Sequence, residues 1–151
     1  LTRWILINGI KQTENETIYI KIPPGIDNNE VIINPRKGNI INDELKGDVK
    51  VFIKVKNNTP FIREGLNLFY QTNITLKESL CGFNFKISHL NGKTFNLNNS
   101  PGNIVSHNQE KIIPNLGMMR DNSKGNLIIR FNVEFPKKLE LSTITKLKEL
   151  L

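Results

Sequence analysis

Cysteine is almost missing from this sequence. Cys81 is the only one among 151 residues, so the chain cannot form an internal disulfide or gather thiolates around a metal. Such scarcity is typical of a reducing compartment, and we therefore expect a cytoplasmic location. The sequence starts without Met. We expect it to be a fragment whose targeting signals lie elsewhere, which leaves an exported location open.

Histidine is also scarce, and this counts against catalysis. His89 lies beside a predicted hairpin turn and His107 lies in a polar loop. Neither has a cysteine or carboxylate neighbour at the spacing that metal ligands or a catalytic pair require. Gly82 and Gly92 are isolated turn glycines rather than parts of a phosphate-binding loop. The sequence predicts no enzyme, no cofactor and no metal, with His89 on the surface and Cys81 packed as a small apolar residue.

Alanine is absent altogether, and no apolar run approaches the ~20 residues that a membrane-spanning helix needs. Alanine is the strongest helix former, whereas the abundant isoleucine favours strands. The composition therefore indicates a mainly β protein.

Positive charge exceeds negative charge, with 21 Lys and Arg against 14 Asp and Glu and a net charge of +7. Such an excess would suit nucleic acid or an acidic membrane surface. The basic residues are scattered, however, and Lys50 and Lys54 alternate with apolar neighbours such as Val51, as in a strand with one wet face. We interpret the charge as a diffuse surface property that an acidic peptide could also use. A basic nucleic-acid-binding domain remains the alternative.

Period-two alternation of apolar and polar residues runs through most of the chain. The dipeptide Asn91-Gly92 separates two such segments and predicts a type I′ hairpin turn. The pattern predicts strands over residues 17–22, 49–55, 65–74, 83–88, 94–97 and 126–135.

Two short helices are expected. Thr75 and Glu78 form a capping box, so a helix should run over 76–81 and end at Gly82. Near the C-terminus, Ser142 is the predicted cap of a second helix. Its apolar stripe must meet another surface, because a helix of about ten residues is marginal in water by itself. That stripe consists of Ile144, Leu147 and Leu151.

The polar junction around residues 57–60 is the best candidate for a boundary. We predict two tandem β-sandwich-like subdomains, 1–57 and 58–137, followed by a dimerisation helix over 138–151.

Several segments, in order, resemble the C-terminal region of DnaJ-type (J-domain) co-chaperones. Residues 60–68, Pro-Phe-Ile-Arg-Glu-Gly-Leu-Asn-Leu, are similar to that family's P-x-F-x-R-x-G-x-D-L signature, which is the most specific match. The other resembling segments are 17–27 with its Ile-Pro-Pro-Gly-Ile-Asp turn, the Gly-Asp strand 47–53, Leu-Cys-Gly at 80–82, the hairpin 90–93 and the final strand 125–136.

The resemblance implies a non-catalytic module that holds extended apolar segments of unfolded proteins, forms a homodimer and delivers its clients to a 70-kDa heat-shock chaperone. In that family the peptide adds alongside a strand of the first subdomain, as in β-augmentation. By position, the implied groove residues are Ile5, Ile7, Ile18, Ile20 and Val51. Arg3 and Lys21 are implied to bind the acidic tail of the partner chaperone, and Ile144, Leu147 and Leu151 to dimerise.

The sequence also departs from the family pattern. Val51 stands where the family has an aromatic residue, Asn67 replaces the signature aspartate, and 34–39 replaces a basic-Gly-Glu-Gly stretch. The four Cys-x-x-Cys repeats and the J-domain are missing from these residues, which points to a zinc-free class or to a fragment that excludes the repeats. Without the resemblance, ordinary sheet core would be the simpler explanation of Ile18, Ile20 and Val51.

Overall fold

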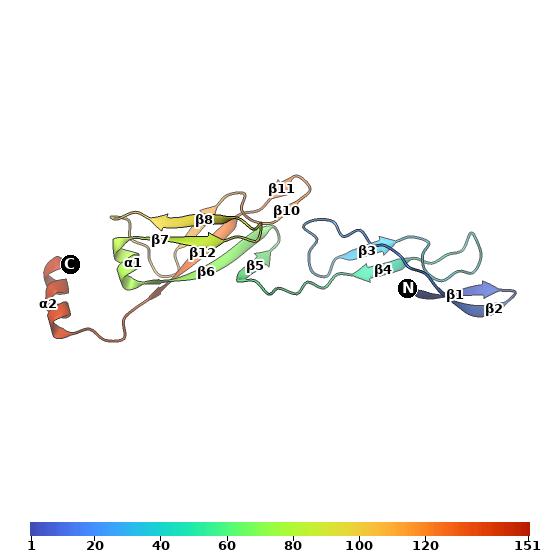
Figure 1. Cartoon of the computed structure of the whole chain (residues 1–151), viewed down its shortest axis with the longest axis horizontal. Helices are drawn as coiled ribbons and strands as arrows, with labels where there is room; N and C mark the ends of the chain where they lie inside the picture. The colour runs from blue at the N-terminus through green and yellow to red at the C-terminus, as the bar shows by residue number, and fades with distance from the viewer. The chain divides into compact units, whose positions relative to one another are not determined.

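The computed structural model describes residues 1–151 and is mainly β (Figure 1). The chain forms two compact units: unit 1 contains residues 1–59 and 118–124, and unit 2 contains residues 60–117 and 125–151. The chain passes from unit 1 to unit 2 between Thr59 and Pro60, residues 118–124 return to unit 1, and the C-terminal helix belongs to unit 2.

Unit 1 consists of three antiparallel hairpins. The first joins β1 (Thr2–Ile7) to β2 (Ile10–Asn15), and the second joins β3 (Val31–Asn34) to β4 (Val49–Phe52). The third, formed by β10 (Met119–Arg120) and β11 (Ser123–Lys124), comes from the later part of the chain.

The turn between β1 and β2 is Asn8-Gly9, with φ values of 48° and 75°. Two consecutive residues with positive φ make the type I′ geometry that a two-residue hairpin favours. The turn sets the register that pairs Ile7 with Ile10 and Trp4 with Thr13.

The predicted strand over 17–22 is not a strand in the structure. These residues are extended, but none of them exchanges a backbone hydrogen bond with another segment. The period-two pattern correctly distinguishes Ile18 and Ile20, which are half-buried, from the exposed Tyr19, but Ile22, predicted on the same face, is 61% exposed. The pattern does not say whether a neighbouring strand is present, and residues 17–22 have none to pair with.

Unit 2 is built on a four-stranded sheet with the order β5-β6-β12-β9. β12 runs parallel to β6, whereas the pairs β5–β6 and β12–β9 are antiparallel. The hairpin of β7 and β8 forms a separate two-stranded sheet, visible beside β6 and β12 in Figure 1. The elements of unit 2 are β5 (Phe61–Glu64), β6 (Asn67–Thr75), α1 (Leu76–Cys81), β7 (Phe83–Ser88), β8 (Thr94–Asn99), β9 (Glu110–Ile113), β12 (Leu127–Glu134) and α2 (Leu141–Leu150).

All buried apolar side chains of the protein lie in unit 2. Along β12, alternate residues such as Leu127 and Ile129 are fully buried, and Leu97 of β8 is 1% exposed. Each such side chain contributes roughly 1.5–3 kcal/mol by leaving water. In unit 1 the apolar side chains are at best half-buried, so unit 1 has the weaker core.

The local predictions for unit 2 hold for the first helix and fail at one turn. Thr75 Oγ1 accepts a hydrogen bond from Glu78 N (3.1 Å), and Glu78 Oε2 accepts one from Thr75 N (2.8 Å), which confirms the capping box. The type I′ prediction at Asn91-Gly92 is wrong, because only Gly92 has a positive φ, of 79°. The loop instead closes with a bond of 3.0 Å from Gly92 N to His89 O.

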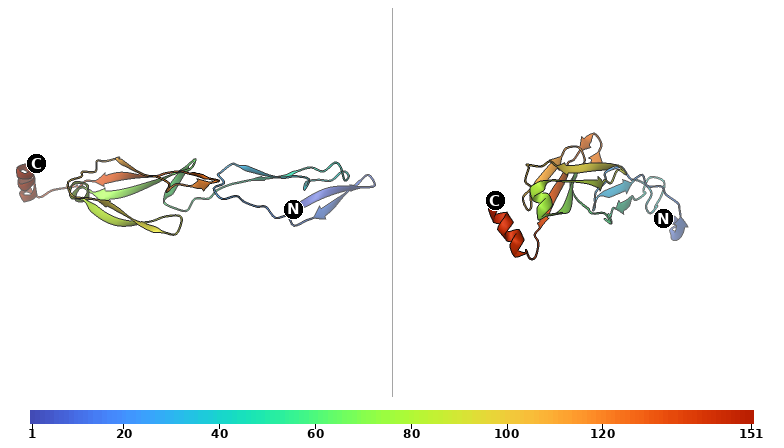
Figure 2. Two further views of the ribbon diagram at one scale, coloured as in Figure 1. Left: turned by 90° about the horizontal axis from the view of Figure 1, so that it is seen from above. Right: turned by 60° about the vertical axis from the view of Figure 1, so that its left-hand side comes forward.

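Helix α2 begins one residue after Glu140, so Ser142 lies inside its first turn and is not the cap that we predicted. An extended stretch joins α2 to β12 (Figure 2). No residue of α2 is buried. Leu141 and Leu150 are 81% and 80% exposed, while Ile144 and Leu147 are half-buried.

Candidate peptide-binding surface

The extended segment 17–22 is the most unusual feature of unit 1. Its backbone N–H and C=O groups have no hydrogen-bond partner within the chain, so water satisfies them. Tyr19 is 92% exposed and Lys21 is also exposed, so one face of the segment is open to solvent. The segment therefore offers a backbone edge that another extended chain can pair with.

The other predicted groove residues lie on two further stretches of unit 1. Ile5, in β1, is half-buried and bridges to Ile40, with hydrogen bonds from Leu6 N to Ile40 O (2.9 Å) and from Ile40 N to Trp4 O (3.0 Å). Ile7, at the end of β1, is 42% exposed.

Val51 lies in β4, is half-buried and pairs with Ile32. The structure thus gathers the five residues in one unit and leaves each of them partly accessible.

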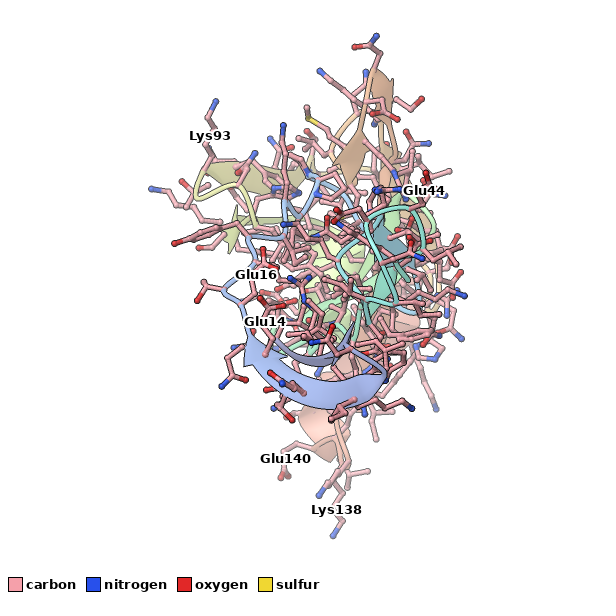
Figure 3. The ribbon with its side chains drawn as sticks, turned by 90° about the vertical axis from the view of Figure 1, so that its right-hand side faces the viewer. Glu14, Glu16, Glu44, Lys93, Lys138 and Glu140 are labelled. Carbon is pink, nitrogen blue, oxygen red and sulfur yellow. The ribbon has the colours of Figure 1, made fainter.

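Arg3 is already surrounded by acceptors. Its Nε lies 2.9 Å from Glu14, one of its terminal nitrogens lies 2.6 Å from Glu16, and the other donates to Lys37 O (3.1 Å). Figure 3 shows Glu14 and Glu16 close together beside the β1–β2 hairpin. With its side chain only 10% exposed, Arg3 is a cross-link within unit 1. Lys21 is exposed and forms no ion pair, so it is the more accessible of the two predicted tail-binding cations.

Glu16 joins the other cation of this cluster, with Lys37 Nζ 2.7 Å away. The hydrogen bond from Lys37 holds the pKa of Glu16 below its usual range; partial burial opposes this effect, and the charges of Arg3 and Lys37 add to it.

A carboxylate with a lowered folded-state pKa stabilises the fold above its unfolded pKa, near 4.3, and loses that effect as the pH falls through the folded value. We therefore expect unit 1 to loosen below about pH 4. Trp4, the only tryptophan of the chain, reports this in an acid titration of fluorescence. Glu16→Gln should remove most of the acid-dependent step, and an unchanged step would contradict this origin.

The pairing of Arg120 with Glu30 was not visible in the sequence. The Arg120 guanidinium donates two hydrogen bonds to the Glu30 carboxylate, at 2.6 and 2.8 Å, and so ties the β10–β11 hairpin to the start of β3. Ninety positions separate the two residues, and neither belongs to a motif. The nearby Gly25 has a φ of 80°, and a Cβ on it would lie 2.2 Å from Met119 O.

His89 and Cys81 differ from the predictions in their surroundings, whereas His107 lies in an exposed loop as expected. His89 is half-buried rather than a surface residue: its Nε2 lies 2.8 Å from Leu116 O, and its ring contacts Phe61 edge-on at 5.6 Å. His107 Nδ1 accepts a hydrogen bond from Val133 N (3.1 Å). Cys81 is exposed, although we expected it to be packed.

No cluster of three or more His, Cys, Asp or Glu residues could hold a metal ion. None of the helices has the length and apolar character needed to cross a membrane.

Comparison with known proteins identifies the family. The model of the DnaJ C terminal domain matches residues 3–136. The chain belongs to the DnaJ C-terminal domain family. The matched region begins inside β1, extends past β12 and ends before α2, so it includes most of both units.

Relatives of the chain carry DnaJ names. It is 33% identical over 129 residues to DnaJ protein homolog 1 of Allium porrum, which covers 83% of this chain and 32% of that protein. It is 32% identical to chaperone protein dnaJ 2 of Arabidopsis thaliana, in an alignment that covers 84% of this chain and 31% of that protein. A more distant relative is the mitochondrial protein import protein mas5 of Schizosaccharomyces pombe, at 29% identity with 83% and 31% covered. The chain spans about a third of the length of these relatives.

Proposed function

We propose that this chain is a non-catalytic co-chaperone module that binds extended apolar segments of unfolded proteins through unit 1. The observation that carries the proposal is the unpaired backbone of residues 17–22, a segment whose Ile18 and Ile20 are half-buried. Membership in the DnaJ C-terminal domain family supports the same role.

The mode of binding is β-augmentation. A client segment that runs alongside 17–22 satisfies the free backbone groups, which gives affinity for almost any sequence. Side-chain preference comes from the apolar residues that point to one face, Ile18 and Ile20, together with Ile5, Ile7 and Val51. Because Val51 is small, we propose that the groove accepts a bulky aliphatic or aromatic side chain at that position.

The groove residues can be tested by introducing a charge. Ile20→Asp should weaken binding of a capped, leucine- and phenylalanine-rich peptide of about eight residues at least tenfold, because a carboxylate then faces the apolar side chains of the peptide. Ile33→Asp is the matched control, since Ile33 is a 56% exposed isoleucine of β3 whose side chain lies on the opposite face of the hairpin from Val51.

Fluorescence anisotropy gives both affinities, and amide NMR shifts locate the peptide. The absence of saturable binding, or shifts confined to unit 2, would count against the proposal.

Delivery of clients to a 70-kDa heat-shock chaperone is the second part of the proposed function. An acidic tail of such a partner would meet a chain of net charge +7. We propose that Lys21 contacts the tail directly and that Arg3, held by Glu14 and Glu16, shapes the surface beneath it.

We also propose that α2 forms a homodimer contact. Its stripe, Ile144, Leu147 and Leu151, includes a terminal leucine that is 91% exposed. Next to it, α1, the end of β12 and Leu147 line a mostly apolar pocket of about 520 Å³, which can accept side chains from α2 of a second copy.

Deletion of residues 140–151 should therefore give a monomer in sedimentation velocity at concentrations where the intact chain is a dimer. Leu151→Asp should act in the same direction without shortening the chain, because it places a charge in the proposed contact. If the deletion leaves the mass unchanged, α2 is not the dimer contact.

A further inference from the structure

A second cleft, of about 620 Å³, opens in unit 2 beside β9. Its floor is apolar and consists of Phe83, Val105 and Phe131, of which the last two are 4% and 3% exposed. The rings of Phe83 and Phe131 lie 5.5 Å apart. A cleft of this volume is within the range of ligand-binding pockets.

Unpaired strand edges lie on both sides of this cleft. β9 is the terminal strand of its sheet and pairs only with β12, and β8 pairs only with β7. Neither strand has another backbone hydrogen-bond partner along its cleft edge. The N–H and C=O groups of these edges can therefore receive an additional extended chain.

Lys111 supplies the charge of the cleft. It pairs across the sheet with Ile129, which is 0% exposed, so its side chain leaves the strand on the face that carries the core. A lysine in that position breaks the alternation of the sheet, and it forms no ion pair or hydrogen bond within the chain. The only carboxylate in the cleft lining, that of Glu110, is occupied by Arg130 at 3.0 and 2.5 Å.

Four amide side chains also line the cleft, those of Asn98, Asn99, Asn103 and Gln109. Asn99 donates to Asn103 O and Gln109 accepts from Ser106 N, whereas the side chains of Asn98 and Asn103 form no hydrogen bond within the chain. Amide groups match the alternating donors and acceptors of a peptide backbone.

We propose that this cleft binds an extended segment of another polypeptide in which a carboxylate lies next to an aliphatic side chain. The aliphatic side chain lies on the floor formed by Phe83, Val105 and Phe131. The carboxylate pairs with the ammonium of Lys111, and the backbone pairs with the edge of β9. This site is separate from the groove of unit 1 and differs from it in requiring an acidic residue.

Charge and shape favour this occupant over nucleic acid. A nucleic-acid strand needs a row of cations along its backbone and aromatic faces on which bases can stack. The cleft offers one lysine, and its Phe131 ring is buried. A single cation beside an apolar floor matches a single carboxylate beside an aliphatic group.

The test uses the full chain and two capped peptides of about eight residues, one alternating leucine with aspartate and the other alternating leucine with lysine. We expect the acidic peptide to shift the amide resonances of Asn98, Val105 and Lys111, and the basic peptide to bind there at least tenfold more weakly. Lys111→Glu should weaken the acidic peptide about tenfold and improve the basic one, whereas Lys111→Gln should lie in between.

Lys93→Glu is the matched control, because Lys93 projects into solvent from the β7–β8 turn and the variant has the same change in net charge (Figure 3). Equal effects of the two charge reversals would show nonspecific attraction and overturn the proposal. It is also overturned if the acidic peptide shifts only amides of unit 1. The leucine- and phenylalanine-rich peptide used for unit 1 distinguishes the groove of unit 1 from the cleft of unit 2, since its binding should depend on Ile20 and not on Lys111.

Discussion

Gly125→Ala should prevent unit 2 from folding stably. A Cβ on this buried glycine would lie 1.8 Å from Leu66 O and 2.2 Å from Leu66 C, and neither is the end of a flexible side chain. Relief would require the backbone to move where Gly117 N donates to Gly125 O (2.9 Å) and Leu68 N to Asn126 O (2.9 Å). Those bonds start the pairing of β12, so we expect a loss of more than about 3 kcal/mol in the free energy of unfolding.

Gly92→Ala is the matched control for this substitution within unit 2. No atom lies within 4 Å of its added Cβ, so only its φ of 79° opposes the new side chain. The control should therefore cost about 1–2 kcal/mol. Denaturant titration followed by the methyl resonances of Leu127 and Ile129 reports unit 2 directly. Equal midpoints for the two variants would mean that the backbone around Leu66 can yield at little cost.

Much of unit 2 could be predicted from the sequence because its signals are local. The capping box at Thr75 and Glu78 needs only four residues. The alternation along 126–135 correctly predicts a strand, and β12 finds a partner strand on each side, β6 and β9. The hairpin dipeptides show the limit of local signals. Asn8-Gly9 forms the type I′ turn, whereas Asn91-Gly92 lies in a longer loop, in which His89 reaches Leu116 O.

The candidate surface of unit 1 was only partly predictable, for a different reason. Alternation indicates that Ile18 and Ile20 face inwards, but it fails for Ile22, which is 61% exposed, and it says nothing of pairing, which depends on distant segments. The same holds for Arg3, whose partners Glu14, Glu16 and Lys37 are brought together by the hairpin register and not by a motif. Lys111 was overlooked because a lysine between Glu and Ile is unremarkable until Ile129 is found opposite it.

Gly25→Ala should release the β10–β11 hairpin from unit 1. Gly25 has a φ of 80°, which costs a residue with a Cβ about 1–2 kcal/mol, and the added atom would lie 2.2 Å from Met119 O. Unit 1 has no fully buried apolar side chain to absorb such a loss. We expect a decrease of about 3 kcal/mol or more in the stability of unit 1, measured by Trp4 fluorescence during denaturation.

Gly9→Ala separates the conformational cost of a positive φ from the steric clash with Met119 O. Gly9 also lies in unit 1 with a similar φ of 75°, but nothing lies within 4 Å of its added Cβ. It should therefore show the conformational cost alone, about 1–2 kcal/mol. If both variants unfold alike, the close approach of Met119 to Gly25 does not hold the hairpin. The ion pair between Arg120 and Glu30 also joins the hairpin to unit 1, but both side chains are about a third exposed, so water screens their attraction. We therefore expect backbone packing at Gly25 to contribute more than this ion pair to holding residues 118–124 in unit 1.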